Sequence, residues 1–302
     1  METLKSWILA ARLRTLPLSV SGILVGTAMA ENKGYFDLQV FIFSLLTTIG
    51  FQVLSNFAND YGDGVKGTDN SNRVGPKRAL QSGLLSAADL KKGMVVTGII
   101  SLITACFVIY FAFGNEQFLL SVIFFVLGIA AIVAAITYTV GRRAYGYRAM
   151  GDLFVFLFFG LLSVLGSYFL YAKQLEFIQL FPAISIGLLS VGVLHLNNMR
   201  DREADAKVGK RTVAVVLGAE KSMIYHYFLL IGAFASWLCF LKFNAAGIFS
   251  YLSMLGFIPV IIHLFSVRKR QQQQQQTLDP ELKKIALATF FVALLYFTIS
   301  FL

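Results

Sequence analysis

The stretch LQVFIFSLLTTIGFQVLSNFANDYGDGVKGTD at residues 38–69 joins a long apolar run to a cluster of acids and glycines. Residues 38–58 contain no charged side chain. A hydrocarbon core of about 30 Å needs about 20 helical residues to cross it. This part of the chain is therefore predicted to be a transmembrane helix with a carboxylate-rich end.

Apolar segments of the same kind recur along all 302 residues, of which 57% are hydrophobic and only 14% charged. Soluble domains carry about a quarter charged residues. We therefore expect an all-α, polytopic membrane protein that forms a single domain over residues 1–302. With 38–58, the predicted spans number nine, the others being 15–31, 94–113, 117–140, 152–171, 177–199, 224–242, 246–266 and 284–302.

Positive charge is concentrated on one side of these spans. Of the 26 lysines and arginines, all but Lys33, Lys173 and Lys242 precede the first span or fall in 59–93, 141–149, 200–222 and 267–284. Cytoplasmic loops carry such an excess. The N-terminus and the loops 59–93 and 200–222 are therefore predicted to be cytoplasmic, with the C-terminus outside, in the cell (inner) membrane. The net charge of +10 reflects this topology and not nucleic-acid binding. The glutamine-rich residues 267–283 are predicted to be a low-complexity connector.

The first polar motif ends the second predicted span. Asn56, Asp60 and Asp63 recur at helical spacing, so they are predicted to line one helix face. Asp69 follows on a glycine-rich loop. Carboxylates this close repel one another at a membrane edge, and a bound divalent cation would relieve that repulsion. Whether Asp63 or Asp69 reaches such a cation is left open.

The second motif, NNMRDREAD at 197–205, ends the sixth predicted span on the same side. Asn197, Asp201 and Asp205 share one helical face, from which Arg200 and Arg202 are predicted to point away. The pattern Asn-x-x-x-Asp thus occurs twice, 141 residues apart. Two such ridges on the same side of the membrane predict a bundle whose two halves are related.

The residue types favour magnesium held together with a diphosphate. Mg²⁺ takes one or two carboxylates plus phosphate oxygens and water, and neither motif contains the His or Cys that zinc prefers. The predicted metal ligands are Asp60, Asp63, Asp69, Asp201 and Asp205. The residues predicted to bind the diphosphate are Asn56, Asn197, Arg73, Lys77, Arg78, Arg143, Arg148 and Lys210, although each basic residue could also serve the topology alone.

Several stretches resemble the UbiA-type intramembrane prenyltransferases: NDYGD with its trailing GTD, RVGPKR at 73–78, YGYRAMGD at 145–152, and NNMRDREAD followed by GKRT. The resemblance covers essentially the whole chain. NDYGD and RVGPKR are most similar to the branch that uses 1,4-dihydroxy-2-naphthoate in menaquinone biosynthesis.

This resemblance implies nine helices around a central cavity with cytoplasmic cap loops. It further implies transfer of a polyprenyl group from polyprenyl diphosphate to 1,4-dihydroxy-2-naphthoate with loss of its carboxylate, giving demethylmenaquinone. Asp60, Asp201 and Tyr138 are the predicted catalytic residues. Alternative acceptors are 4-hydroxybenzoate, homogentisate and haem. Outside enzymes, a transporter is the main alternative, but it would place ionisable groups near mid-membrane.

Overall fold

The computed structural model describes residues 2–69, 75–244, 247–273 and 278–302. Within them, β pairing is limited to an isolated bridge between Arg148 and Arg211. The α-helices are α1 (Glu2–Ala11), α2 (Leu16–Glu31), α3 (Leu38–Val65), α4 (Ala87–Phe113), α5 (Phe118–Thr137), α6 (Gly151–Val155), α7 (Ser167–Ala172), α8 (Leu180–Lys207), α9 (Val213–Phe243), α10 (Ile258–Gln273) and α11 (Leu278–Ser300). Between them lie the 3₁₀-helices η1 (Leu13–Thr15), η2 (Tyr145–Tyr147), η4 (Phe177–Gln179) and η5 (Ile248–Phe257), and the π-helix η3 (Phe156–Gly166).

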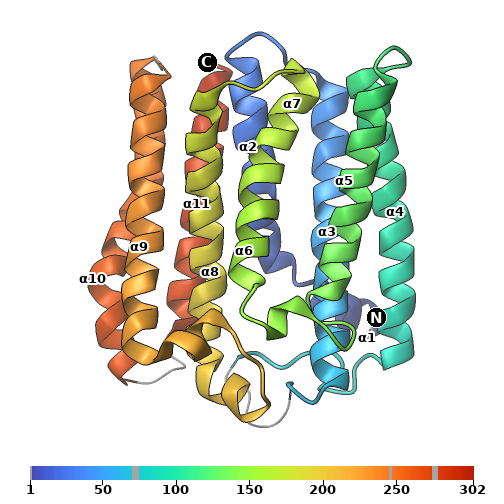
Figure 1. Ribbon diagram of the computed structural model, residues 1–302, viewed down its shortest axis with the longest axis vertical. Helices are drawn as coiled ribbons and strands as arrows, with labels where there is room; N and C mark the ends of the chain where they lie inside the picture. Colours follow the sequence, from blue (N-terminus) through green and yellow to red (C-terminus); the bar gives the residue numbers. More distant parts are fainter. Residues whose placement is uncertain (1, 70–74, 245–246, 274–277) are drawn as a thin grey trace.

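Nine helical stretches of the described chain are long and apolar enough to cross a bilayer. They run from Leu4–Glu31 to Leu278–Ser300, and each overlaps one predicted span, so the predicted fold class is confirmed. Figure 1 shows them side by side in one bundle. The C-terminus lies at the end opposite the loops that follow α3 and α8.

Two of these helices extend beyond their predicted spans into the polar motifs. α3 continues beyond residue 58 to Val65, and α8 continues beyond residue 199 to Lys207. Apart from Asp69, which follows α3 on a loop, the acids of both motifs therefore lie on helices, and the helices fix their directions.

The bundle is held together by aromatic packing and by close helix contacts. Trp237, Tyr168 and Tyr296 are among the largest fully buried side chains. Gly160 of η3 faces Gly187 of α8, where a Cβ on Gly160 would lie only 2.6 Å from the Gly187 Cα. Large apolar side chains such as Phe118 and Phe228 point outward, as expected of a surface in contact with lipid.

A buried polar chain joins α9, α10 and α11. His226 Nε2 lies 2.8 Å from His263 Nε2, and His263 Nδ1 lies 2.6 Å from Glu281. Lys284 completes the chain by donating to Glu281 at 2.9 Å. The two contacts of His263 thus link α10 to α9 and to α11.

Candidate active site

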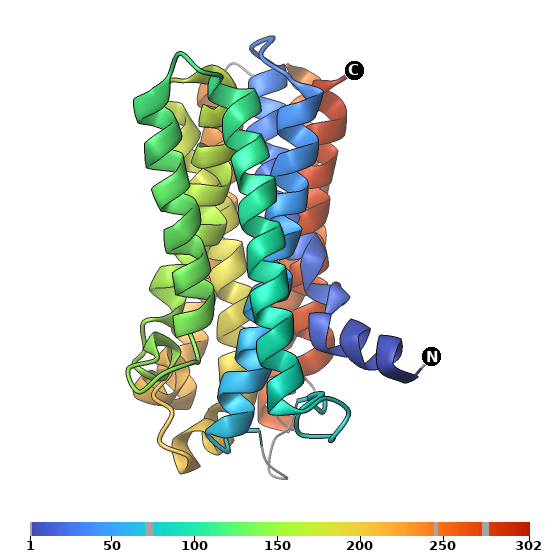
Figure 2. The same ribbon diagram turned by 90° about the vertical axis from the view of Figure 1, so that its right-hand side faces the viewer.

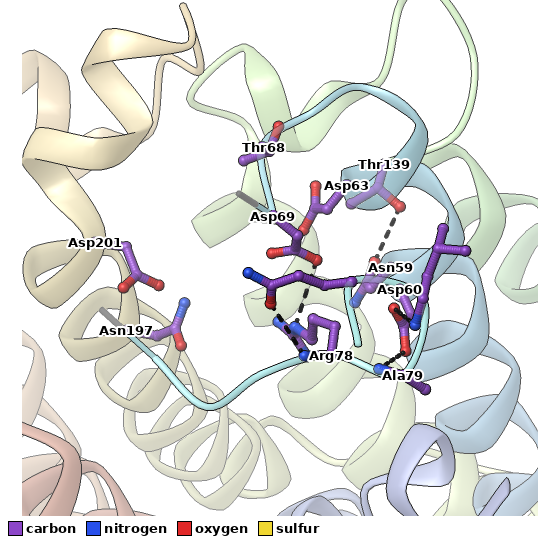
Figure 3. A network of polar contacts seen from close by, with 12 residues as sticks. Asn59, Asp60, Asp63, Thr68, Asp69, Arg78, Ala79, Thr139, Asn197 and Asp201 are labelled. Atoms are coloured by element: carbon purple, nitrogen blue, oxygen red, sulfur yellow. Dashed lines mark hydrogen bonds and ion pairs between the residues drawn. The ribbon is translucent and has the colours of Figure 1, made fainter. Parts of the chain in front are cut away.

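Both motifs reach one cavity. α3 and α8 carry their acidic residues to the same end of the bundle, where they line a cavity of about 980 Å³. Asn59 and Asp63 line it from α3, and Asn197, Asp201 and Asp205 line it from α8. Figure 3 shows Asp63 and Asp201 on opposite sides of this space. The structure therefore brings the two acidic ridges together.

The two motif helices end in the same way. Gly67 and Gly209 have φ angles of 72° and 74°, a conformation that glycine adopts at little cost. Each lets the next N–H donate back to the carbonyl oxygen of Asp63 or Asp205 at 2.9 Å. Asp63 and Asp205, 142 residues apart (205 − 63), thus hold the same position relative to the glycine that ends each helix.

Asn59, and not Asn56, presents its side chain to the cavity. Asn56 Nδ2 donates to the carbonyl oxygen of Ala11 at 2.8 Å, which ties α3 to the end of α1. Asn59 lines the cavity, with its Oδ1 3.2 Å from the Thr139 hydroxyl (Figure 3). Asn56 is thus turned toward the start of the chain, and its position gives no support to the predicted diphosphate contact.

Asp60 is also turned away from the cavity. Its carboxylate accepts the N–H of Ala79 at 3.1 Å and of Leu80 at 3.3 Å (Figure 3). Asp60 is buried but does not line the cavity. Hydrogen bonds to a charged acceptor are strong. In this structure Asp60 therefore holds residues 75–80 against α3, and its metal and catalytic roles stay predictions.

Asp63 has a dense set of polar neighbours. The Tyr147 hydroxyl donates to Asp63 Oδ1 at 2.7 Å, and the Thr68 hydroxyl lies 2.6 Å from the same phenol. Lys210 Nζ lies 3.9 Å from Asp63 Oδ2. Burial raises the pKa of Tyr147, and the charge on Asp63 raises it further. Because the phenol stays neutral, it remains a donor to the carboxylate.

Tyr147 was not predicted as a site residue, and two loops bring it there. The N–H of Ala149 donates to the Arg211 carbonyl oxygen at 2.6 Å, and the N–H of Arg211 donates to the Tyr147 carbonyl oxygen at 3.3 Å. Lys66 and Lys210 place their ammonium groups 4.1 and 5.3 Å from the Tyr147 ring centroid. Desolvation lowers the pKa of Lys66. Local sequence patterns do not show that these two distant loops pair, so they could not identify Tyr147 as a site residue.

Asp69 pairs with a predicted diphosphate-binding residue. Arg78 Nε lies 3.7 Å from Asp69 Oδ2 (Figure 3). Arg78 lines the cavity, whereas Asp69 is buried and is not among the residues that line it. Of the two carboxylates left open by the sequence, Asp63 is therefore the one at the cavity wall.

Arg200 lies on the acidic ridge. Its guanidinium donates to both oxygens of Asp201, at 2.9 and 2.7 Å, and to Asn197 Oδ1 at 2.8 Å. It also forms an ion pair with Asp279 at the start of α11. The prediction that Arg200 points away from this face is wrong, because the flexible side chain folds back along the helix to reach its own neighbours.

Lys210 connects the two ridges. Its ammonium lies 3.7 Å from Asp205 Oδ1 and 3.9 Å from Asp63 Oδ2. Lys210 lines the cavity, as predicted. A single cation between two carboxylates lowers their mutual repulsion.

Three other predicted basic residues that the structure describes, Arg143, Arg148 and Lys77, do not line the cavity. Arg143 and Arg148 are exposed, and Arg148 contributes its backbone to the bridge with Arg211. Lys77 lines a separate pocket. Arg73 lies outside the described residues. The predicted diphosphate contacts of Arg143, Arg148 and Lys77 are therefore not supported by their positions.

Tyr138, which follows the fourth span, also lines the cavity. Its ring packs edge-to-face on Tyr145, with centroids 5.2 Å apart. Burial raises the pKa of Tyr138, and the charges of Asp63 and Asp152 add to the effect. The phenol is therefore neutral at physiological pH.

The rest of the cavity is mainly apolar. η3 contributes Phe158, Phe159 and Leu162, and α5 contributes Phe124 and Leu127. The wider i→i+5 turns of a π-helix are often found at functional sites. The cavity thus joins a charged end to a hydrocarbon-like body, which suits an amphiphile with an anionic head.

The carboxylates that line the cavity fit Mg²⁺ only together with a bound anion that supplies further oxygen ligands. Among the described residues, no three His, Cys, Asp or Glu side chains come close enough to hold a metal by themselves. Asp63, Asp201 and Asp205 offer carboxylate oxygens from two sides, while Arg78 and Lys210 add positive charge. Mg²⁺ usually takes one or two carboxylates and completes its shell with phosphate and water oxygens.

Fold and site together define a polytopic helical membrane protein with a cavity for an anionic amphiphile. The UbiA prenyltransferase family matches residues 19–298. The chain belongs to this family. It is 43% identical to a Haemophilus influenzae protein named 1,4-dihydroxy-2-naphthoate octaprenyltransferase, over 98% of this chain and 95% of that protein. An Escherichia coli protein of the same name is 37% identical, over 91% and 87% of the two chains.

Solved structures show the same fold. A UbiA homolog from Archaeoglobus fulgidus, bound to GPP and Mg²⁺, matches with a TM-score of 0.68 and 18% identity, over 98% of both chains. A UbiA homolog from Aeropyrum pernix matches with a TM-score of 0.69 and 16% identity, over 94% of this chain and 99% of that one. The nine-helix bundle is therefore shared by distant members of the family.

Proposed function

We propose that this protein transfers a polyprenyl group from polyprenyl diphosphate to 1,4-dihydroxy-2-naphthoate in menaquinone biosynthesis. The allylic C–O bond to diphosphate breaks, a C–C bond to the ring forms, and the ring carboxylate leaves as CO₂, giving demethylmenaquinol. The observation that carries the proposal is one cavity with facing acidic ridges at one end and an apolar body. The names of the Haemophilus influenzae and Escherichia coli relatives support this acceptor.

The charged end of the cavity is proposed to hold the diphosphate. Lys210 and Arg78 supply positive charge at the wall, and Asn59 and Asn197 supply amide groups. Asp63, Asp201 and Asp205 would hold Mg²⁺ there, the ion with which the Archaeoglobus fulgidus homolog was solved. Bound Mg²⁺ would stabilise the negative charge that develops on the departing diphosphate.

Tyr138 and the apolar body are proposed to protect the reacting carbon. A neutral phenol presents an electron-rich ring that stabilises a cation-like allylic carbon. Phe158, Phe159 and Leu162 would surround the isoprenoid and keep water from competing with the aromatic acceptor. Arg200, which donates to Asp201 at 2.7 Å, would hold the Asp201 carboxylate in place at the charged end of the cavity.

An acceptor panel tests the proposal. The purified protein in lipid nanodiscs receives Mg²⁺, labelled polyprenyl diphosphate and, in turn, 1,4-dihydroxy-2-naphthoate, 4-hydroxybenzoate, homogentisate or haem. Mass spectrometry should detect a prenylated, decarboxylated quinol with the naphthoate. Prenylation of another acceptor in its place would transfer the proposal to that substrate, and release of no diphosphate with any acceptor would refute the enzymatic function.

A further inference from the structure

Asp152 is a buried acid that does not line the cavity. It occupies the first turn of α6, at the start of the fifth span. Figure 2 shows that the loop before α6 meets the loop after α8 at this end of the bundle. Only 5% of Asp152 is exposed, and neither of its carboxylate oxygens accepts a regular hydrogen bond from the described residues. An ionisable group in this state is costly within a membrane span.

His195 of α8 is a close neighbour of this carboxylate and is fully buried. Its Nδ1 lies 3.5 Å from Asp152 Oδ2, and its Nε2 lies 3.1 Å from the carbonyl oxygen of Ser222. A carbonyl oxygen only accepts, so the Nε2 carries the hydrogen of that contact. A neutral ring would then turn the lone pair of Nδ1 toward another acceptor. The contact is therefore favourable when the ring and the carboxylate share one proton. The Tyr225 phenol also faces Asp152, but without the geometry of a regular hydrogen bond.

The pair adjoins a polar part of the cavity wall. Gly151, which precedes Asp152, packs on Tyr138: a Cβ on Gly151 would lie 3.3 Å from the Tyr138 hydroxyl oxygen and 3.5 Å from Leu194 Cδ2. Tyr138 and Leu194 both line the cavity. A tyrosine hydroxyl donates and accepts at the same time. Tyr138 can therefore pass a proton between the pair and a molecule in the cavity.

A structural role alone does not account for this carboxylate. An acid in the first turn of a helix is stabilised by the free backbone N–H groups there, but Asp152 accepts none of them. Glu281, a buried acid in the first turn of α11, shows the contrast, because it meets His263 at 2.6 Å and Lys284 at 2.9 Å. A buried acid in a membrane without such partners indicates a functional position.

We propose that Asp152 and His195 share one proton and exchange it with the aromatic acceptor through the Tyr138 hydroxyl. This rests on the proposed function, and it assigns the new C–C bond to the ring carbon beside the one that bears the carboxylate. That carbon loses its proton to the pair, and the electrons of its C–H bond restore the ring. The pair returns a proton to the carbon that bears the carboxylate. When CO₂ leaves, the electrons of its C–C bond stay in the ring, so the pair ends with the proton count with which it began.

Exchange of the acid for its amide tests the pair. Asp152→Asn keeps the shape of the side chain, and its amide can donate to His195 Nδ1, so the thermal midpoint should not fall below that of the wild type. The turnover number should fall about a hundredfold at an unchanged KM for the naphthoate, as expected when a proton-transfer group is lost. A fall in the midpoint, or a turnover number equal to that of the wild type, would overturn the proposal.

His226→Gln is the control, because it changes a neighbouring buried histidine that belongs to the chain of His263 and Glu281. It should lower the midpoint with little effect on turnover, the reverse of Asp152→Asn. Equal losses of turnover in the two variants would count against a special role for Asp152.

A double variant tests the route through the hydroxyl. Tyr138→Phe should lower the turnover number, and Asp152→Asn should add little to that loss, because groups that act in series are not additive. Losses that multiply would overturn the route. A wild-type protein that forms no prenylated quinol would refute the proposed function and this inference with it, whereas an active wild type with an unaffected Asp152→Asn would refute the inference alone.

Discussion

Asp60 and Asp63 lie one helical turn apart on α3, yet their carboxylates have different neighbours. Asp60 accepts backbone N–H groups from Ala79 and Leu80. Asp63 meets the Tyr147 phenol and the Lys210 ammonium at the cavity wall. We therefore expect Asp60 to stabilise the fold around the site and Asp63 to be available for the chemistry.

Exchange of each acid for its amide separates these roles. Asp63→Asn is expected to lower turnover about a hundredfold, because the cavity loses a charged group of the diphosphate end, while the thermal midpoint in detergent stays near that of the wild type. Asp60→Asn is expected to lose about 1–3 kcal/mol of stability, because a charged acceptor becomes a neutral one that also carries donors. Prenyl transfer and thermal unfolding, measured on both variants, check this. The opposite ranking of the two variants would contradict the assignment.

The sequence could indicate which motif residues belong together but not which way each side chain turns. Asn59-x-x-x-Asp63 has the same spacing as Asn197-x-x-x-Asp201, and this signal could have identified Asn59. Asn56 shows the same spacing to Asp60, however. Only a tertiary contact distinguishes the two asparagines, because the carbonyl oxygen of Ala11, at the end of α1, accepts a hydrogen bond from the Asn56 side chain.

At the scale of elements, the contact between η3 and α8 determines how closely two walls of the cavity approach. Gly160 and Gly187 meet backbone to backbone, without side chains between them. Close approach of helices through small residues is typical of membrane bundles. Helix positions were predictable from apolar length, whereas the π-helical form of η3 and the extensions of α3 and α8 depend on tertiary contacts and terminal glycines.

A methyl group at this contact should separate the helices. Gly160→Ala would place its Cβ 2.6 Å from the Gly187 Cα and 2.7 Å from the Ala183 carbonyl oxygen. Overpacking of this kind costs about 1–3 kcal/mol, so the thermal midpoint should fall and turnover with it. Gly98→Ala on α4 is the control, since nothing lies within 4 Å of its Cβ. Equal midpoints for the two variants would show that the contact is not tight.

At the scale of the whole molecule, an odd number of spans places the two ends of the chain on opposite sides. The described residues contain nine candidate spans, and the motif loops share their end of the bundle with α1. We infer that this end is cytoplasmic, because 23 of the 26 lysines and arginines fall on its side of the spans.

Thiol labelling tests this orientation. Cys106 and Cys239 are first changed to serine, and one cysteine is then introduced as Arg143→Cys or Leu302→Cys, both at exposed positions. In intact spheroplasts, an impermeant maleimide should label only the Leu302→Cys protein. Arg143→Cys should react once the membrane is permeabilised. Labelling of Arg143→Cys in intact cells would mean that the orientation is reversed.

The ion pair between Arg200 and Asp279 has a consequence for biosynthesis. Asp279 lies in the first turn of the last helix, whereas Arg200 and its other partners belong to the sixth span. Because translation proceeds from the N-terminus, the ribosome has made both acidic ridges well before Asp279 enters the bilayer. Arg200 therefore acquires this neighbour only after the ninth span has begun to be made, long after both acidic ridges.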